Sequence, residues 1–230
     1  MNILAETNDW FAIEKPAMVS AEVLLAELRR FRRGEKFSPI YLVDKEILGI
    51  LLCAKTIEAR NTLKNAYGSD AFTLRFLAWG WSQRQLGVSW ECDLSIAWDD
   101  KKERSYPSKT AGKKSCTHFS VVRNCSPYFQ LECDTHYLRT QQIQIHAHYS
   151  GVDIVGDELW TTNSHFIYLN QLKSVFKKQT HEPIIPGLNL IQTELIFPYQ
   201  GSEQKLCLTP PSSWSTLFKL LERYNQERKA

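Results

Sequence analysis

Short apolar stretches alternate with polar ones along this chain, and their spacing predicts both strands and helices. Gly49 opens the apolar run Ile50 to Ala54, which has the length of a buried strand. Aromatic and β-branched residues predict further strands, and the turn residues between them predict hairpins. The expected strands are residues 10–14, 72–81 and 88–98, with hairpins formed by 118–123 and 128–133 and, around Gly201, by 190–197 and 205–208.

Helical spacing of apolar residues predicts three further elements. Ser20 is placed to cap a helix that ends before Gly34. A second helix is expected over residues 56–67, and a third after Ser213, with an apolar stripe that faces the core. The pattern of residues 140–149 fits either a helix or a strand.

Two segments are expected to be irregular. Residues 99–115 are polar and charged, with Pro107 and Gly112, and predict a long exposed loop. Residues 170–187 have the character of an insertion, with a basic group formed by Lys173, Lys177 and Lys178.

Composition narrows the class of protein. The 230 residues can bury a substantial core, and 43% of them are hydrophobic, as in globular proteins. The net charge of +3 permits a nucleic-acid partner without requiring one. No apolar run approaches the ~20 residues of a membrane span, so no membrane association is expected. The six cysteines contain no CxxC pair, which indicates reduced thiols in a cytoplasmic protein.

Two groups of polar residues are candidate binding sites. The first predicted helix ends in four arginines, which either contact phosphates or form a solvated helix end that complements the helix dipole. His146 and His148 are a weak metal signal, and no metal site is expected there. The four arginines are Arg29, Arg30, Arg32 and Arg33.

Asp44 is notable because it lies between two apolar stretches. It follows Tyr41, Leu42 and Val43, and the buried run that begins at Gly49 comes shortly after it. An aspartate in this setting is often a turn residue whose side chain bonds nearby amides. It is alternatively a catalytic carboxylate held by a rigid strand, and the order of motifs around it favours that interpretation.

Several blocks of residues follow one another along the chain in a characteristic order. They are 13–16, 41–55, 76–80, 137–146 and 151–157, followed by Phe197-Pro198 and Pro210-Pro211. In this order they resemble the RluA-type pseudouridine synthases. The second block resembles the family's catalytic block and places Asp44 on its catalytic aspartate. The third places Phe76 on a family tyrosine, and the fourth resembles the family's arginine-threonine-histidine-glutamine motif.

The resemblance covers nearly the whole chain and implies an α+β fold. A single pseudouridine-synthase-like domain is expected over residues 1–230, with a twisted, mostly antiparallel mixed sheet flanked by helices around a central cleft. No separate N-terminal RNA-binding domain is expected. The resemblance implies that the chain isomerises uridine to pseudouridine in structured RNA, either rRNA or tRNA. In that chemistry Asp44 acts at the ribose C1′ of a flipped uridine, and neither metal nor cofactor is needed. A monomer is expected.

The chain departs from the family at three positions of the expected site. Leu42 and Gln144 stand where the family has arginines, and Phe76 replaces its tyrosine. Without the family's cation, we expect the pKa of Asp44 to exceed its unfolded value of ~3.9, with Lys45 or Arg75 as a replacement cation. The residues expected to bind substrate are Leu42, Phe76, Arg139, Gln142 and Gln144.

Three functions are compatible with these residues. The first is a pseudouridine synthase with Asp44 as its catalytic group. The second is a catalytically inactive relative that binds RNA and acts in RNA folding or assembly. The third is a domain whose cleft binds a protein or a small molecule. A likeness of fold does not by itself decide among them.

Overall fold

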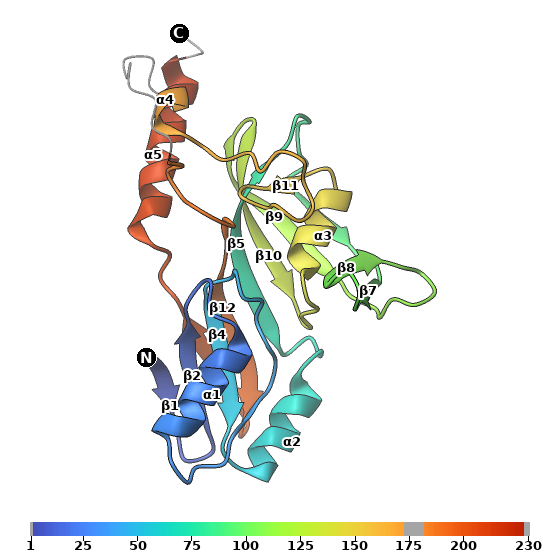
Figure 1. Ribbon diagram of the computed structural model, residues 1–230, viewed down its shortest axis with the longest axis vertical. Helices are drawn as coiled ribbons and strands as arrows, with labels where there is room; N and C mark the ends of the chain where they lie inside the picture. Colours follow the sequence, from blue (N-terminus) through green and yellow to red (C-terminus); the bar gives the residue numbers. More distant parts are fainter. Residues whose placement is uncertain (1, 173–181, 228–230) are drawn as a thin grey trace.

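The computed structural model describes residues 2–172 and 182–227 (Figure 1). The basic group Lys173, Lys177 and Lys178 lies outside these residues. The strands are β1 (Ile3–Glu6), β2 (Trp10–Lys15), β3 (Ser38–Pro39), β4 (Gly49–Ala54), β5 (Thr73–Trp81), β6 (Ser89–Cys92), β7 (Ile96–Asp99), β8 (Arg104–Pro107), β9 (Thr117–Cys125), β10 (Tyr128–Thr135), β11 (Asp153–Ile154), β12 (Leu190–Tyr199) and β13 (Ser202–Cys207). The helices are α1 (Ala21–Phe31), α2 (Ile57–Ala66), α3 (Gln142–Tyr149), α4 (Leu169–Leu172) and α5 (Ser212–Glu227).

The described residues form an α+β fold, as expected, built on two larger sheets and one hairpin. The smaller sheet has the order β1-β2-β4-β3, and the larger has the order β13-β12-β5-β10-β9-β6 with β11 beside β5. The paired strands run antiparallel, and a single parallel bridge between Leu48 and Ile191 joins the sheets within the described residues. Figure 1 shows the smaller sheet at one end of the molecule, beside β12 of the larger sheet, with β9 and β10 of the larger sheet toward the other end.

Strand β4 is apolar throughout because both of its faces are covered. Leu51 and Cys53 pack with the buried leucines of α1, whereas Ile50 and Leu52 belong to the main core on the other face. Helix α1 crosses the small sheet (Figure 1) and begins as expected, since the side chain of Ser20 caps it by accepting from the amide of Val23. The β4 strand and the α1 helix therefore form a rigid frame around the segment that joins them.

One part of the chain differs from its predicted structure. The strand expected over residues 88–98 is divided into β6 and β7, because the carbonyl of Leu94 turns away to accept hydrogen bonds from Ser115 and His146. The loop expected over residues 99–115 contains β8, which pairs with β7 in a hairpin. The side chain of Asp99 accepts from the amides of Lys101 and Lys102 and so makes the turn between the two strands. This hairpin projects from one side of the molecule, beside α3 (Figure 1).

The ambiguous segment 140–149 forms the helix α3. Because it is a helix, His146 and His148 point to different partners, and His146 is fully buried against Thr117 while His148 bonds Asp153. One boundary was wrong, because the terminal helix already begins at Ser212 and not after Ser213. The N-terminal strand β1 was not expected at all. No described helix is long and apolar enough to cross a membrane.

Candidate active site

The segment that carries Asp44 connects β3 to β4. Tyr41 and Val43 are buried while Leu42 is exposed, so the chain alternates inward and outward until it reaches the partly exposed Asp44. The amide of Ile47 then donates to the carbonyl of Asp44 and closes a turn. A Cβ atom at position 49 would lie 2.9 Å from Val43 Cγ1, so glycine is needed where the segment enters β4. Local packing thus fixes the segment on both sides of the carboxylate.

Gln192 of β12 holds both ends of this segment. Its side-chain oxygen accepts from the amide of Ile50 at 3.0 Å, and its side-chain nitrogen donates to the hydroxyl of Tyr41 at 3.1 Å. Its own amide donates to the carbonyl of Leu48 at 2.8 Å. Gln192 is fully buried, so these bonds are shielded from water and tie the segment to the larger sheet.

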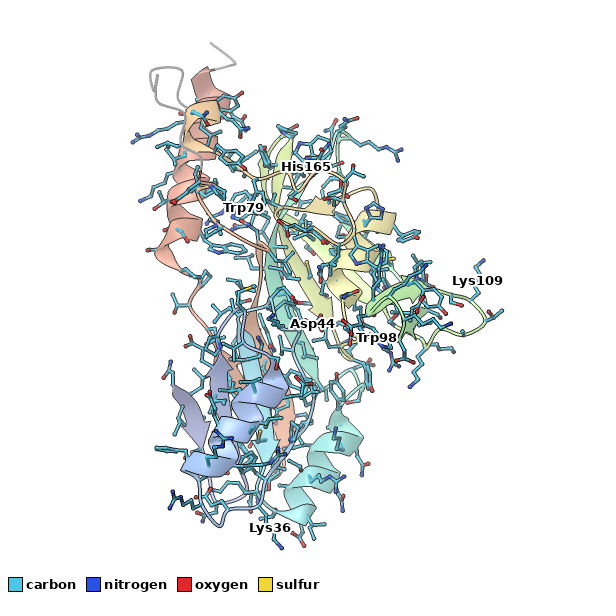
Figure 2. The ribbon with its side chains drawn as sticks, viewed as in Figure 1. Lys36, Asp44, Trp79, Trp98, Lys109 and His165 are labelled. Atoms are coloured by element: carbon cyan, nitrogen blue, oxygen red, sulfur yellow. The ribbon has the colours of Figure 1, made fainter. Side chains whose placement is uncertain are left out.

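Asp44 opens onto a cavity of about 350 Å³. Figure 2 places Asp44 near the middle of the molecule, with Trp98 of the β7–β8 hairpin on the adjacent side. The N-terminus of α1 and the segment that precedes α3 face the same space. The lining residues are Ser20, Ala21, Glu22, Ile40, Tyr41, Leu42, Val43, Asp44, Lys45, Lys64, Tyr67, Tyr137, Leu138 and Thr140. A cavity of this size is at the lower end of the range for small-molecule sites.

The carboxylate of Asp44 is bonded by a residue from the far side of the cavity. The backbone amide of Gln141, just before α3, donates to Asp44 Oδ2 at 2.8 Å. Sequence reasoning did not single out Gln141, although it lies within the fourth of the similar blocks, because a backbone donor leaves no mark on the type of side chain. The bond joins two segments that are 97 residues apart.

Asp44 has the raised pKa that was expected. Burial raises its pKa from 3.8 to about 6, the amide of Gln141 opposes the shift, and the negative charge of Glu46 adds to it. The positive charge of Lys15 favours the ionised form, and Glu22 opposes it. A carboxyl group with this pKa is about nine-tenths ionised at pH 7. The site therefore holds a carboxylate that titrates close to neutral pH.

Lys15 is the buried cation of this region. It is the last residue of β2 and fully buried, and its Nζ atom donates to the carbonyls of Pro16, Val19 and Lys45 at 3.0, 2.8 and 3.1 Å. Burial lowers the pKa of Lys15 to about 8, and the charge of Asp44 is the strongest influence in the other direction. The signal for Lys15 was present in the first of the similar blocks, where it precedes Pro16.

No family model matches this sequence, but curated proteins do. It is 29% identical over 120 residues to YlyB of Bacillus subtilis, named an uncharacterized RNA pseudouridine synthase. It is 22% identical over 184 residues to the ribosomal large subunit pseudouridine synthase D of Zymomonas mobilis. These matches cover 51% and 79% of this chain but 39% and 55% of the relatives, so the chain spans about half the length of the curated relatives it matches.

Solved structures agree with these matches. Human RNA pseudouridylate synthase domain containing 4 has a TM-score of 0.73 at 17% identity, over 96% of this chain and 93% of that one. Human RNA pseudouridylate synthase domain containing 1 has a TM-score of 0.66 at 16% identity, over 96% and 94%. This chain is therefore similar in sequence to curated RNA pseudouridine synthases and shares the fold of the pseudouridylate synthase domains.

The three positions at which this chain departs from the RluA-type pattern lie in different places. Leu42 lines the cavity beside Asp44, with 44% of its surface exposed. Phe76 is fully buried in the core on β5, so in this structure it offers no open face to a ligand. Gln144 is buried and donates its side-chain hydrogen bond to Asp157. Only Leu42 of these three substituted side chains lines the cavity.

Gln142 and Arg139, two of the residues retained in the block 137–146, support the loop before α3. Gln142 is buried, and its side chain bonds the amide of Arg139, the carbonyl of Cys116 and the hydroxyl of Thr135. The guanidinium of Arg139 donates to the carbonyl of Lys114 and lies 4.2 Å from the centre of the Tyr137 ring. These bonds shape the loop that presents Gln141 to Asp44.

Of the two cations proposed from the sequence, Lys45 lines the cavity and Arg75 lies elsewhere. Arg75 lies on β5 and pairs with Asp134 and Glu194, so it does not serve Asp44. The contact that Lys45 makes in this region is through its backbone carbonyl, to Lys15. The arginines at the end of α1 lie at the opposite end of that helix from the cavity, and Arg32 pairs with Glu6. Among the described residues, no cluster of three histidine, cysteine, aspartate or glutamate side chains could hold a metal ion.

Proposed function

We propose that this chain isomerises uridine to pseudouridine in structured RNA, with Asp44 as the catalytic carboxylate. The observation that carries the proposal is the setting of Asp44, a carboxyl group with a pKa of about 6 that opens onto a small cavity and accepts one backbone hydrogen bond. The pseudouridine synthase fold and the curated relatives support the same chemistry.

The chemistry proposed for the cavity needs a single nucleophile. A flipped uridine would place its ribose C1′ next to Asp44, which attacks or assists there as the bond from C1′ to the base nitrogen breaks. The uracil then turns, and its C5 carbon bonds C1′ as Asp44 leaves that atom. The C5 proton is lost to solvent, and the ring nitrogen freed from C1′ takes up a proton. The amide of Gln141 holds the carboxylate in place, and the apolar wall beside it, including Leu42, excludes water from the reacting atoms.

Ribosomal RNA is the substrate class that we favour. The relative from Zymomonas mobilis is named as an enzyme of the large ribosomal subunit, and its match covers most of this chain. Transfer RNA is the alternative, and mapping of pseudouridine in cellular RNA with and without the gene distinguishes the two. That residues 1–230 act as one catalytic domain, as a cytoplasmic monomer without metal or cofactor, stays a prediction.

A second candidate is an inactive relative that binds RNA and assists its folding or assembly. The specific observation in its favour is that no ion pair within 4.0 Å is found for Asp44 in the described part of the chain. In addition, Phe76 has no hydroxyl group and is buried. The cavity would then hold a flipped base without reacting with it.

Release of tritium from RNA labelled at uridine C5 tests the proposal. We expect release by the wild-type protein, none by Asp44→Asn, and normal release by Asp70→Asn, a matched control at an exposed position. If none of the three proteins releases tritium but all bind RNA with an affinity that falls steeply with salt, the second candidate is correct. If there is neither release nor binding, the cavity serves a protein or a small molecule.

A further inference from the structure

Gln141 has an unusual backbone conformation. Its φ and ψ angles are +57° and +20°, in the left-handed region that residues with side chains rarely adopt. Such a residue costs about 1 to 3 kcal/mol and persists only where its surroundings hold it. The backbone amide of Gln141, in this conformation, donates a hydrogen bond to Asp44. The strain is therefore located at the contact with the candidate catalytic group.

The β7–β8 hairpin holds Gln141 through a single residue. The amide of Ser105 donates to the side-chain oxygen of Gln141 at 3.0 Å, and the hydroxyl of Ser105 donates to the carbonyl of Thr140 at 2.8 Å. Ser105 and Gln141 are 1% and 9% exposed, so the bond between them is shielded from water, whereas the bond to Thr140 is only partly buried. From the other side, the carbonyl of Gln141 accepts from Ile145 in the first turn of α3.

We propose that Gln141 is a positioning residue, whose side-chain contact with Ser105 holds its backbone in the conformation that aims its amide at Asp44. The hairpin is thus a support for the candidate active site. This inference deepens the proposed function and rests on it for its catalytic meaning. Its test reads Asp44 directly, so it can fail or succeed whether or not the chain modifies RNA.

Two substitutions at Gln141 separate its side chain from its backbone. Leucine is similar in size but cannot accept from Ser105, so the strained conformation loses its support. Glycine also lacks the contact, but it adopts positive φ angles without strain and can leave the amide where it is. Ser105→Ala removes one of the two contacts, and Ser108→Ala is a matched control in the same region whose hydroxyl accepts from Ala111 instead.

The measurement is the titration of the Asp44 carboxyl carbon by NMR, assigned with Asp44→Asn. Because a lost amide bond disfavours the ionised form, Gln141→Leu should raise the pKa of Asp44 above its value of about 6 by about half a unit or more. Gln141→Gly should give less than half of that rise, Ser105→Ala a smaller rise, and Ser108→Ala none. The charged groups around the cavity, Lys15, Glu22, Lys45, Glu46 and Lys64, are unchanged in all four variants.

The outcomes separate the proposal from its alternatives. Equal shifts in the leucine and glycine variants, or no shift in either, would overturn it. If the leucine variant does not fold, Gln141→Ala, which also cannot accept from the Ser105 amide, replaces it, and an unchanged pKa of Asp44 in that variant overturns the proposal. If the wild type releases tritium from RNA labelled at uridine C5, the leucine variant should lower kcat at least fivefold with little change in KM. A change confined to KM would show that Gln141 binds substrate and does not position Asp44.

Discussion

Two charged regions of this protein hold their charges in opposite ways. On β5, Arg75 donates two hydrogen bonds to Asp134 and a third to Glu194, and these carboxylates hold the pKa of Arg75 above its usual range. At the cavity, the bonds found in the described residues join Lys15 to carbonyls and Asp44 to an amide. The first region pairs opposite charges directly, whereas the second keeps them apart.

The difference shows that one fold can pair charges directly in one region and keep a carboxyl group titrating near neutral pH in another. Direct pairing moves pKa values away from neutrality, because each partner favours the charged form of the other. Separation combined with burial does the reverse, and brings Asp44 up to about 6 and Lys15 down to about 8. Groups that titrate near neutral pH are suited to nucleophilic and acid–base roles. The four substitutions below test this contrast.

Removing the cation of the paired region should have the largest effect. Arg75→Met leaves three carboxylates, Glu132, Asp134 and Glu194, close together without their shared partner. Because the Arg75 side chain is 30% exposed, we expect a loss of about 2 kcal/mol in the free energy of unfolding, less than for a fully buried pair. Urea unfolding at pH 7 measures it. The pKa of Asp44 should not change, and a shift there would mean that the two regions are coupled.

Removing the charge of Asp44 should stabilise the protein. Its pKa is higher in the folded protein than in the unfolded chain, so the folded state binds more protons between about pH 4 and 6 and the free energy of unfolding falls as pH rises across that window. Asp44→Asn should therefore gain about 1 to 2 kcal/mol at pH 7 and almost nothing at pH 4. Thermal unfolding at both pH values checks this, and equal effects at the two values would contradict it.

Giving Asp44 a direct partner should make the cavity resemble the paired region. Leu42→Arg places a guanidinium on the cavity wall, which should lower the pKa of Asp44 by about one unit, or ~1.4 kcal/mol. Because Asp44 is already mostly ionised at pH 7, a gain in tritium release should be confined to pH values below about 6. NMR titration of Asp44 measures the pKa, and Gln144→Arg is the matched control, because Gln144 bonds Asp157. A larger fall in the pKa of Asp44 from Gln144→Arg than from Leu42→Arg would show that this division of roles is wrong.

Removing the charge of Lys15 should give the smallest change in free energy of the four substitutions. Lys15 favours the ionised carboxylate without contacting it, so Lys15→Met should raise the pKa of Asp44 by about half a unit, or ~0.7 kcal/mol. NMR titration measures the shift, with Lys36→Met as the control at an exposed position (Figure 2). A rise of several units would mean that the two side chains form a direct pair.

The sequence predicted most of the framework because each local signal agreed with the fold. The apolar run of β4, the capping residues Ser20 and Thr56 and the turn at Gly201 were all found where expected. The β7–β8 hairpin was missed because its turn depends on the side chain of Asp99, one acidic residue among many charges. The many charged residues of segment 99–115 indicated only an exposed loop.

The candidate site was predicted less completely, since its contacts depend on register and distance along the chain. Asp44 could be selected from the order of the blocks, and its raised pKa followed from apolar neighbours. Lys15 could not be assigned, because its position beside the Asp44 segment follows from its pairing opposite Gly49 in the β2–β4 ladder. The full burial of Phe76 was also hidden, because alternation along β5 does not reveal which face is closed.

The hydrogen bonds of Gln192 to the Asp44 segment have a consequence for when that segment folds during synthesis. The Asp44 segment is synthesised early, but its bonds from Tyr41 and Ile50 reach a residue 151 and 142 positions further along the chain. Contacts at such sequence separation form late in folding, because a long stretch of chain must first be brought together. On the ribosome, the segment that carries Asp44 cannot acquire its final shape until Gln192 has emerged.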